Sequence, residues 1–484
     1  MSIYKTFQQQ TMTPSLNLTQ EQILILEKAK LLKQGQILKI NACAGSGKTF
    51  TLKQIALTNP KSKFLYLAFN KTIAEQSLKT FPMNVEVKTI HALAYAFVKK
   101  HYENFTLHPS NLKIFDIAYL FPELRAEQLN IILKLFNDFL KSDAKEPYHQ
   151  EVLKIADAMI KGELGFTHDF YLKLYALAQK TNLKKYDFLL LDEAQDSNAV
   201  MLSIFLHNPC KKILVGDTFQ NIYGFNQTVN AIEKVKADFS LNLSTSFRST
   251  QDILDYADSF LDAYSTKTKV KMQSSLKKKE TIKTQAFISR TNAGLIEMMD
   301  SFFKEKVNLE DFALLKEPES IFRLLFDIFY FRSHHFEFIS KENAFLHHFN
   351  SMSELRSYAN YDTELSMVLN LSEKKYDFKS LKKLAFKLYR NKKAHSFLIN
   401  AHLSKGLEWD RVTLHNDFPN LEELQLKIFE EKNLNEKDKR EFELEQELNL
   451  FYVAITRARF ELVDKTTNLK EKSFLKFFPF FKKL

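Results

Sequence analysis

The apolar and polar positions of the chain follow a pattern that changes several times along its length. Between residues 36 and 98, short apolar runs alternate with stretches whose apolar positions recur at helical spacing. The runs at 64–70 and at the start of 85–98 have the length of strands and precede such stretches. This alternation is typical of a parallel sheet with helices on its faces. A helix capped near Thr19 is predicted before the first strand.

The sheet pattern is interrupted twice. From 99 to 183 the spacing is helical without a clear strand, and strand-like runs resume at 188–196 and 212–217. A second alternation begins at 241–250 and is interrupted by a helix-rich stretch at 301–393. We interpret both interruptions as helical insertions in sheet domains.

The pattern predicts an α/β chain of several domains, since 484 residues are too many for a single hydrophobic core. The expected parts are a first sheet domain at 1–98 and 184–240, its helical insertion at 99–183, a second sheet domain at 241–300 and 394–484, and a small helical insertion at 301–393.

A loop of small residues follows the first predicted strand, and Lys48 and Thr49 open the helix after it. Backbone N–H groups of such a loop hold polyphosphate, and Gly45 and Gly47 leave room for its approach. Lys48 can reach the β- and γ-phosphates while the Thr49 hydroxyl ligates Mg²⁺. The usual first glycine is Ala42 here, so an ordinary loop is the alternative. The strand before and the helix after the loop favour a nucleotide site.

Two adjacent acids, Asp192 and Glu193, end an apolar strand. ATP hydrolysis needs one carboxylate on Mg²⁺ and a second that activates water, and this position supplies both. A solvated acid pair at a strand end is the alternative reading. The phosphate-binding loop elsewhere in the chain favours catalysis.

A further strand ends in a turn that carries Gln220, Tyr223 and Phe225. The glutamine could sense a γ-phosphate, and the rings could stack on bases, although such aromatics more often belong to a core. Arg248 and Arg457 could be surface arginines or could stabilise charge in phosphoryl transfer.

Bulk composition changes this picture in two ways. The balance of 69 Lys and Arg against 58 Asp and Glu gives a net charge of +11, which suits a nucleic-acid partner or lysine-rich solvated faces. Two cysteines, Cys43 and Cys210, cannot build a disulfide framework, and no long apolar run or apolar signal region is present. We therefore expect a cytoplasmic protein, nucleoid-associated if prokaryotic, that does not enter a membrane, with the Cys43 thiol against the nucleotide.

Eight segments, in order along the chain, resemble the motifs of the UvrD/Rep group of superfamily 1A helicases. These segments are ACAGSGKT, LAFNK, TIHAL, LLDEAQD, VGDTFQNIYGF, LSTSFRS, AHLSKGLEWDRV and ELNLFYVAITRA. The phrases FLYLAFNKTIAEQ, VKTIHALAY and THDFYLKLYAL are also similar to the F-box DNA helicase branch. No F-box region is expected ahead of the motor.

The resemblance implies two RecA-like P-loop NTPase domains, with ATP and Mg²⁺ between them and single-stranded DNA across both. The implied catalytic residues are Lys48, Thr49, Asp192, Glu193, Gln220, Arg248 and Arg457, with Thr49 and Asp192 on Mg²⁺. The implied nucleotide-binding residues are Gln22, Ala42, Cys43, Ala44, Gly45, Ser46, Gly47, Lys48, Thr49, Phe247 and Glu408, with Gln20 as a competing register for Gln22. The implied DNA-binding residues are Phe69, Asn70, His91, Tyr223, Phe225 and His402.

The resemblance further implies an ATP-dependent DNA translocase and helicase that moves 3′ to 5′ as a monomer. Its substrates would be single-stranded DNA, junctions or tailed duplexes, in DNA repair or recombination control. The chain departs from the family at Asn226, Ser246 and Ala401, and both helical insertions are short for the family. A nucleotide-gated DNA-binding regulatory subunit without productive unwinding is the alternative. The pathway, any protein partner and the role of the phenylalanine- and lysine-rich tail stay open.

Overall fold

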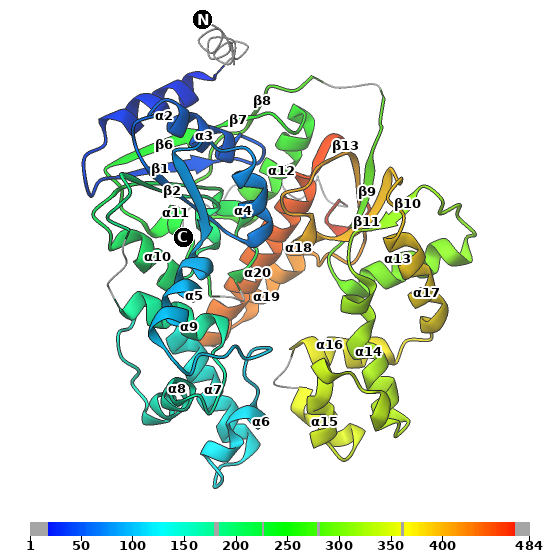
Figure 1. Cartoon of the computed structure of the whole chain (residues 1–484). Coiled ribbons are helices and arrows are strands. Elements are labelled where there is room, and N and C mark those ends of the chain that lie inside the picture. The colour runs from blue at the N-terminus through cyan, green and yellow to red at the C-terminus, as the bar shows by residue number, and fades with distance from the viewer. Residues whose placement is uncertain (1–17, 179–182, 225–226, 278–280, 360–362, 470–484) are drawn as a thin grey trace, which may run out of the picture.

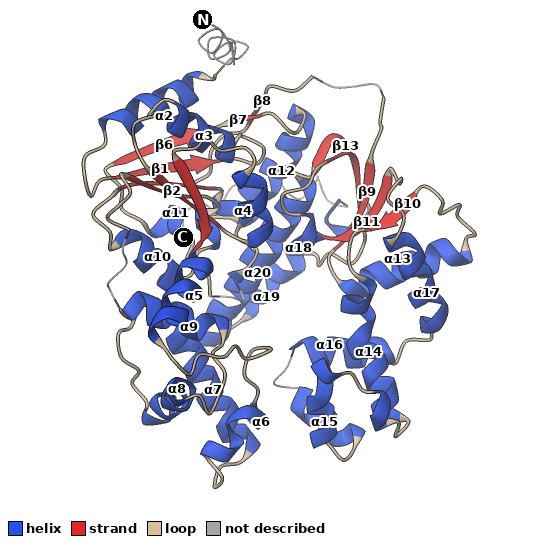
Figure 2. Cartoon of the chain, viewed as in Figure 1, coloured by secondary structure: helices blue, strands red, loops and turns tan. Residues whose placement is uncertain are grey.

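Two parallel sheets lie side by side, and helical regions extend from both towards the lower part of the view (Figure 1). Figure 2 shows the strands gathered at these two places, with helices around them. The computed structural model describes residues 18–178, 183–224, 227–277, 281–359 and 363–469.

The first sheet has six parallel strands in the order β3-β2-β4-β5-β1-β6. Tyr66 and Leu190 pack towards one face, while Leu65 and Leu189, their neighbours in sequence, pack towards the other. Burial of both faces explains why the central strands are continuous apolar runs. The strands are β1 (Ile37–Ala42), β2 (Phe64–Ala68), β3 (Val85–Thr89), β4 (Phe188–Leu191), β5 (Lys211–Gly216) and β6 (Phe239–Leu243).

Helices cover both faces of this sheet. One face is covered by α2 (Gln20–Leu31), α3 (Lys48–Leu57) and α4 (Lys71–Leu78), and the other by α5 (Ile90–His101), α9 (His168–Leu177), α10 (Ala199–Leu206) and α11 (Ala231–Lys234). The cap predicted for α2 is confirmed. The Gln22 N–H donates to Thr19 Oγ1 at 3.2 Å, and the Thr19 N–H donates to Gln22 Oε1 at 3.0 Å.

The helical stretch after α5 shares its core with the first sheet. Phe136, Ile155 and Phe170 belong to the same hydrophobic cluster as Leu65 and Leu189. The stretch is therefore anchored to one face of the sheet by continuous packing. Its elements are α6 (Ile114–Ile117), η1 (Ala118–Leu120), α7 (Ala126–Lys141) and α8 (Gln150–Lys161), followed by α9.

The second sheet has five parallel strands in the order β10-β11-β9-β12-β13. These are β9 (Gln285–Ser289), β10 (Phe312–Leu314), β11 (Ser396–Asn400), β12 (Trp409–Leu414) and β13 (Ala458–Asp464). One face packs on α12 (Gln251–Tyr264), α19 (Leu421–Glu430) and α20 (Leu434–Ile455), and the other on α13 (Asn292–Lys304), α14 (Pro318–Arg332) and α17 (Phe378–Tyr389).

The structure moves two of the expected boundaries. Residues 241–250 were expected to open the second sheet domain, but β6 pairs with β1, with Leu38 opposite Phe239 and Ala42 opposite Leu243. The expected helical insertion at 301–393 contains β10, which pairs with β11. It also contains α14 and α17, which pack on the second sheet. A short apolar strand within a helix-rich stretch has too few residues to show an alternating pattern.

A smaller hydrophobic cluster lies at the far end of α14. It joins Ile328 and Phe331 of that helix to Leu346, Leu355 and Leu369. The part of 301–393 that has a core of its own is therefore shorter than expected. Its elements are η5 (Phe336–Phe338), η6 (Lys341–His348), α15 (Met352–Ala359) and α16 (Thr363–Ser372).

Short elements complete the parts around the sheets. They are η2 (Ala194–Asp196), η3 (Thr218–Gln220), β7 (Thr245–Ser246), β8 (Gln273–Ser274), α18 (Ala401–Ser404) and η7 (Thr467–Leu469). Within the described ranges, no helix has both the length and the apolar character needed to cross a bilayer.

Candidate functional site

The loop between β1 and α3 has the backbone shape of a phosphate-binding loop. Gly45 and Gly47 have φ angles of 72° and 78°, in the left-handed region that favours glycine. A Cβ on Gly45 would lie 2.4 Å from the Cβ of Arg248. Glycine is required at position 45 because the backbone there is left-handed and lies against the segment that contains Arg248.

The side chains predicted to act on a nucleotide meet at the carboxyl edge of the first sheet. Lys48 Nζ lies 2.8 Å from Glu193 Oε2, and Thr49 Oγ1 donates to Asp192 Oδ2 at 2.6 Å. Tyr66 also donates to Asp192 Oδ2, at 2.7 Å. Glu193 thus contacts Lys48 while Asp192 contacts Thr49, which agrees with the separate roles predicted for the two acids.

The charges at this edge shift one another's pKa values. Burial alone would lower the pKa of Lys48, but the carboxylates of Glu193, Asp217 and Asp192 together outweigh burial and raise it. Burial would raise the pKa of Glu193, but Lys48 and Lys405 lower it to about 2. Burial and the neighbouring Glu193 raise the pKa of Asp192. At neutral pH, Lys48 and Glu193 therefore form an ion pair.

The Thr49 hydroxyl and the Asp192 carboxylate fit Mg²⁺. Both are hard oxygen ligands, and their oxygens are 2.6 Å apart. Neighbouring ligands of octahedral Mg²⁺ lie about 2.9 Å apart, so a small separation would make room for the ion. Among the described residues no group of three or more His, Cys, Asp or Glu could hold a metal. Mg²⁺ usually keeps several waters and binds phosphate oxygens of its substrate, and these would supply the other ligands.

Gln195 and Asp217 connect the acid pair to Gln220. Gln195 Nε2 donates to Glu193 Oε2 at 2.6 Å, and its Oε1 accepts the Asp217 N–H at 3.1 Å. Gln220 Nε2 donates to Asp217 Oδ2 at 2.8 Å. A Cβ on Gly216 would lie 2.4 Å from Gln195 Oε1, so glycine is needed for this contact. A hydrogen-bonded path thus leads from the catalytic candidate Glu193 to Gln220.

The two candidate arginines are already bonded within the protein. Arg248 Nε donates to Glu408 Oε2 at 3.0 Å. Arg457 is fully buried, and its Nε and Nη1 donate to the carbonyl oxygens of Val453 and Leu407 at 2.8 and 3.2 Å. Burial lowers the pKa of Arg457, and the nearby Arg248 lowers it further. The structure brings the two arginines together, but both must change partners to reach a nucleotide.

The segment that leaves β6 lies along the phosphate-binding loop. The Cys43 N–H donates to the Leu243 carbonyl at 3.0 Å, and the Phe247 N–H donates to the Gly45 carbonyl at 2.9 Å. Ser246 Oγ also donates to the carbonyl of Ala44 at 2.8 Å. The connection between the two sheets is therefore hydrogen-bonded to the nucleotide-binding candidate itself.

Two residues expected to hold adenine lie beside this loop. Gln22 is buried, and its Nε2 donates to Thr51 Oγ1 at 3.3 Å on α3, whereas Gln20 is exposed. Phe247 is 42% exposed, so its ring is accessible for stacking on a planar ligand. The sequence left Gln20 and Gln22 as alternatives, and the geometry favours Gln22.

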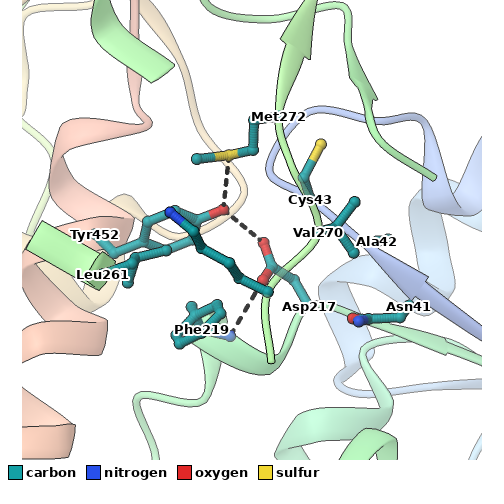
Figure 3. Close-up of a pocket in the computed structure, with 10 residues that line it drawn as sticks. Asn41, Ala42, Cys43, Asp217, Phe219, Leu261, Val270, Met272 and Tyr452 are labelled. Carbon is teal, nitrogen blue, oxygen red and sulfur yellow. Dashed lines mark hydrogen bonds between the residues drawn. The ribbon is translucent and has the colours of Figure 1, made fainter. Parts of the chain in front are cut away.

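The Cys43 thiol faces the interior, which corrects the expectation that it lies against the nucleotide. Its Sγ is 3.3 Å from the Ser244 carbonyl, and it lines a small pocket with Asp217, Met272 and Tyr452 (Figure 3). Burial raises the pKa of Cys43. In this arrangement the Cys43 thiol is bonded within the protein, and its backbone is the part that a nucleotide in the loop could contact. The remaining loop residues, Ala42, Ala44 and Ser46, are also buried.

An aromatic row crosses from the first sheet to the second. The Phe69 and Tyr223 rings stack at 5.4 Å, and Tyr223 lies 6.5 Å from the ring of His402. Lys405 Nζ lies 5.1 Å from the centre of the Tyr223 ring. Burial lowers the pKa of His402 to about 4, so its ring is neutral at pH 7. Phe225, expected to continue this row, lies outside the described residues.

The other two expected DNA contacts have different surroundings. The His91 ring lies 6.4 Å from that of His168 and 6.1 Å from that of Tyr171. Asn70 caps α4, where its Oδ1 accepts the Ile73 N–H at 2.9 Å. The side chain of Asn70 therefore has a structural role in this state, which its position after a strand could have suggested.

Sequence reasoning missed several residues of this site. Lys405 forms an ion pair with Asp196 and donates to the Gln220 carbonyl at 2.6 Å, so a residue of the second half of the chain enters the acidic site. Arg290 pairs with Glu447 beside the aromatic row. Lys405 precedes Gly406 in the connection between two buried strands. A cation at that position was the one feature of the sequence that could have indicated a role for Lys405 in the site. The partners of both pairs are too distant in sequence for any spacing to connect them.

Comparison with known proteins gives two family matches and two similar relatives. An AAA domain matches residues 27–226, and a UvrD-like helicase C-terminal domain matches residues 339–467. F-box DNA helicase 1 of Gallus gallus is 33% identical over 286 residues, covering 51% of this chain and 28% of the relative. F-box DNA helicase protein 1 of Schizosaccharomyces pombe is 27% identical over 527 residues, covering 94% of this chain and 58% of the relative. The chain thus spans less than two thirds of the length of both relatives.

Proposed function

Because the chain has a UvrD/Rep-like superfamily 1 helicase core, we propose that it is an ATP-driven motor that moves on single-stranded DNA. The observation that carries the proposal is the contact of Lys48 and Thr49 with Glu193 and Asp192. Each residue pair joins the two loops that a phosphate-transferring P-loop enzyme needs. We also propose the division into two motor domains with helical insertions. The first domain would end after β6, and the second helical insertion would begin at the far end of α14.

Lys48 is the group that ATP would rearrange first. It now pairs with Glu193, and a β- or γ-phosphate would compete for the same ammonium group. Lys48 is the main charge that holds the pKa of Glu193 near 2. Its departure would raise that pKa and make Glu193 a stronger base for the attacking water. Nucleotide binding would in this way prepare its own hydrolysis.

Mg²⁺, when bound with ATP, would neutralise phosphate charge beside Thr49 and Asp192. The side chain of Gln220 would contact the γ-phosphate. The backbone carbonyl of Gln220 already accepts a hydrogen bond from Lys405, so a shift of Gln220 would reach the aromatic row through Lys405. Arg248 and Arg457 would leave Glu408 and the backbone carbonyls to stabilise charge in the transition state. The adenine would lie by Gln22 and Phe247, with Glu408 near the sugar.

The proposed DNA path follows the aromatic row Phe69, Tyr223 and His402, with His91 near its start and Phe225 and Asn70 as further contacts. Stacking of bases on such rings is insensitive to sequence, which suits a protein that moves along DNA. We propose 3′ to 5′ movement on single strands at junctions or tailed duplexes, by a monomer, in DNA repair or recombination control.

The test measures ATP hydrolysis by the wild type with and without single-stranded DNA, with Lys48→Ala as the matched control. We expect DNA to stimulate the wild type and the control to have no turnover in either condition. Absence of hydrolysis by the wild type in both conditions would refute the motor. Strand displacement on 3′-tailed and 5′-tailed duplexes then tests unwinding and direction.

A second candidate is a nucleotide-gated DNA-binding regulatory subunit without productive unwinding. The observation that favours it is that Arg457 donates hydrogen bonds to backbone carbonyls. In this arrangement Arg457 is therefore not available to stabilise charge in phosphoryl transfer. This candidate predicts that ATP changes the affinity for single-stranded DNA although DNA does not stimulate hydrolysis.

A further inference from the structure

A tyrosine from the second half of the chain reaches beneath the phosphate-binding loop. Tyr452 belongs to α20, and its hydroxyl accepts the Ala44 N–H at 3.2 Å. The same hydroxyl lies 3.1 Å from Asp217 Oδ2 and 3.5 Å from Met272 Sδ (Figure 3). The side chain is 2% exposed, so these contacts lie in the interior of the protein.

The hydroxyl of Tyr452 is the donor in its contact with Asp217. Burial raises the pKa of Tyr452 well above its ordinary value, and the nearby Asp217 raises it further. The hydroxyl therefore keeps its proton at neutral pH. Because it also accepts from Ala44, it joins a backbone N–H of the loop to a carboxylate by a pair of directed hydrogen bonds.

Asp217 passes this contact to Gln220. Its Oδ2 accepts from both Tyr452 and Gln220 Nε2, and its Oδ1 accepts the Phe219 N–H at 3.1 Å. The Asp217 N–H donates to Gln195, which also bonds Glu193. The orientation of the Gln220 amide is thus fixed by a carboxylate whose second side-chain partner is Tyr452.

We infer that Tyr452 is a positioning residue, which orients Gln220 through Asp217 and so links the position of α20 to the nucleotide site. The inference rests on the proposed motor function and deepens it. Since α20 packs on the second sheet and Asp217 follows β5 of the first, a shift between the sheets changes the distance from Tyr452 to Asp217. Gln220 would then turn with Asp217.

The test replaces the hydroxyl while keeping the ring, with Tyr452→Phe. In ATPase assays saturated with single-stranded DNA, we expect kcat to fall about tenfold. This is the fall expected if the whole free energy of a hydrogen bond to a charged group is lost from the transition state. The KM for ATP should change less than about twofold, because the Tyr452 hydroxyl contacts the loop at the Ala44 N–H and not at Lys48 or Thr49. An unchanged kcat would overturn the inference.

Tyr256→Phe is the matched control. Tyr256 also lies on a helix of the second sheet, and its hydroxyl donates to Asp464 at 2.6 Å, away from the phosphate-binding loop. Loss of that bond should lower the melting temperature and leave kcat unchanged. An equal fall in kcat in both variants would mean that Tyr452 acts only through stability, and would overturn the inference.

A double-mutant cycle separates a route through Gln220 from an independent effect. If Tyr452 acts by orienting Gln220, Tyr452→Phe should not reduce kcat further in a Gln220→Ala background. Multiplicative losses would overturn the proposed route.

A readout that needs no turnover keeps the inference distinct from the proposed function. The side-chain amide ¹⁵N signal of Gln220, assigned by its loss in Gln220→Ala, should shift in Tyr452→Phe and stay in place in Tyr256→Phe. If the wild type has no ATPase, the proposed function fails, and this signal still decides the inference. An unshifted signal would overturn it.

Discussion

Replacing Lys405 by methionine should loosen the contact between the two halves of the protein. Lys405 follows α18, near the second sheet, and pairs with Asp196 of η2, beside the first. The two side chains are 10% and 0% exposed, and Lys405 also donates to the Gln220 carbonyl. The substitution keeps most of the length of the side chain and leaves a buried carboxyl without its cation.

Removal of one partner from a buried ion pair typically costs about 3–5 kcal/mol. We expect a loss at the lower end of this range, about 3 kcal/mol, because Asp196 can take up a proton. Protonation removes part of the cost of burying an unpaired carboxylate. If both sheets melt together, the unfolding entropy is that of the whole chain of 484 residues, at about 2.1 cal/mol/K per residue. The melting temperature then falls by roughly 3 °C, at about 1 °C per kcal/mol.

The loss should depend on pH in one direction. Burial raises the pKa of Asp196 in the folded protein from 3.8 to about 6, although Lys405 opposes this. A carboxyl with a raised folded pKa stabilises the fold at low pH, and that contribution is lost as the pH rises through the folded value. Without Lys405 the folded pKa rises further, so the variant continues to lose stability above pH 6. The difference between wild type and variant should therefore widen from about pH 5 to about pH 8.

The assay is thermal unfolding of Lys405→Met, Asp196→Asn and the double variant at several pH values. The double variant should be more stable than Lys405→Met alone, since it buries no unpaired carboxylate. Lys71→Met is the control, because Lys71 and Glu75 form a pair at 3.8 Å that is 89% and 60% exposed. It should melt like the wild type. A loss in Lys405→Met that is equal at all pH values would refute the reasoning.

Three further outcomes are expected. Glu193→Gln should still bind ATP, measured with a fluorescent analogue, but should hydrolyse it about 10²–10⁴-fold more slowly, and normal turnover would contradict its role as base. Gly45→Ala should lower the melting temperature and weaken ATP binding, since a left-handed alanine costs about 1–2 kcal/mol and its Cβ would meet Arg248; wild-type values for both would contradict this. Alkylation of Cys43 and Cys210 by iodoacetamide, followed by mass spectrometry, should be slow with and without ATP, because both thiols are buried and burial raises the pKa of each. Rapid labelling of native Cys43 would show that its thiol is accessible.

The parts of the site that follow from local spacing could be predicted. A strand, a loop of small residues and a helix that begins at Lys48 lie within one short segment, and the acid pair ends another apolar strand. Parallel strands bring both carboxyl ends to one edge, so Lys48 and Glu193 had to approach each other. The cap of α2 followed in the same way from Thr19 and Gln22.

Contacts between distant segments could not be predicted from spacing. Lys405 lies 209 residues from Asp196, and Tyr452 lies 235 residues from Asp217. Such pairs depend on how the second sheet sits against the first, which no periodicity encodes. The same limit explains why β6 was assigned to the wrong sheet. Its pairing with β1 assigns that strand to the first sheet, and this pairing does not appear in the sequence pattern.

The balance of charge in the site gives a physical reason for the two halves to move together. The buried and half-buried groups around the phosphate-binding loop include more carboxylates than lysines, namely Asp192, Glu193, Asp196 and Asp217 against Lys48 and Lys405. Burial raises the pKa values of Asp192, Asp196 and Asp217, so the site already resists further negative charge. A nucleotide triphosphate adds several negative charges, which a single divalent ion cannot balance in a buried site. Arg248 and Arg457 are nearby cations that could turn towards a nucleotide, and Arg457 lies two residues after the end of the helix that carries Tyr452. Binding of ATP should therefore draw α20 towards the loop, and hydrolysis should release it.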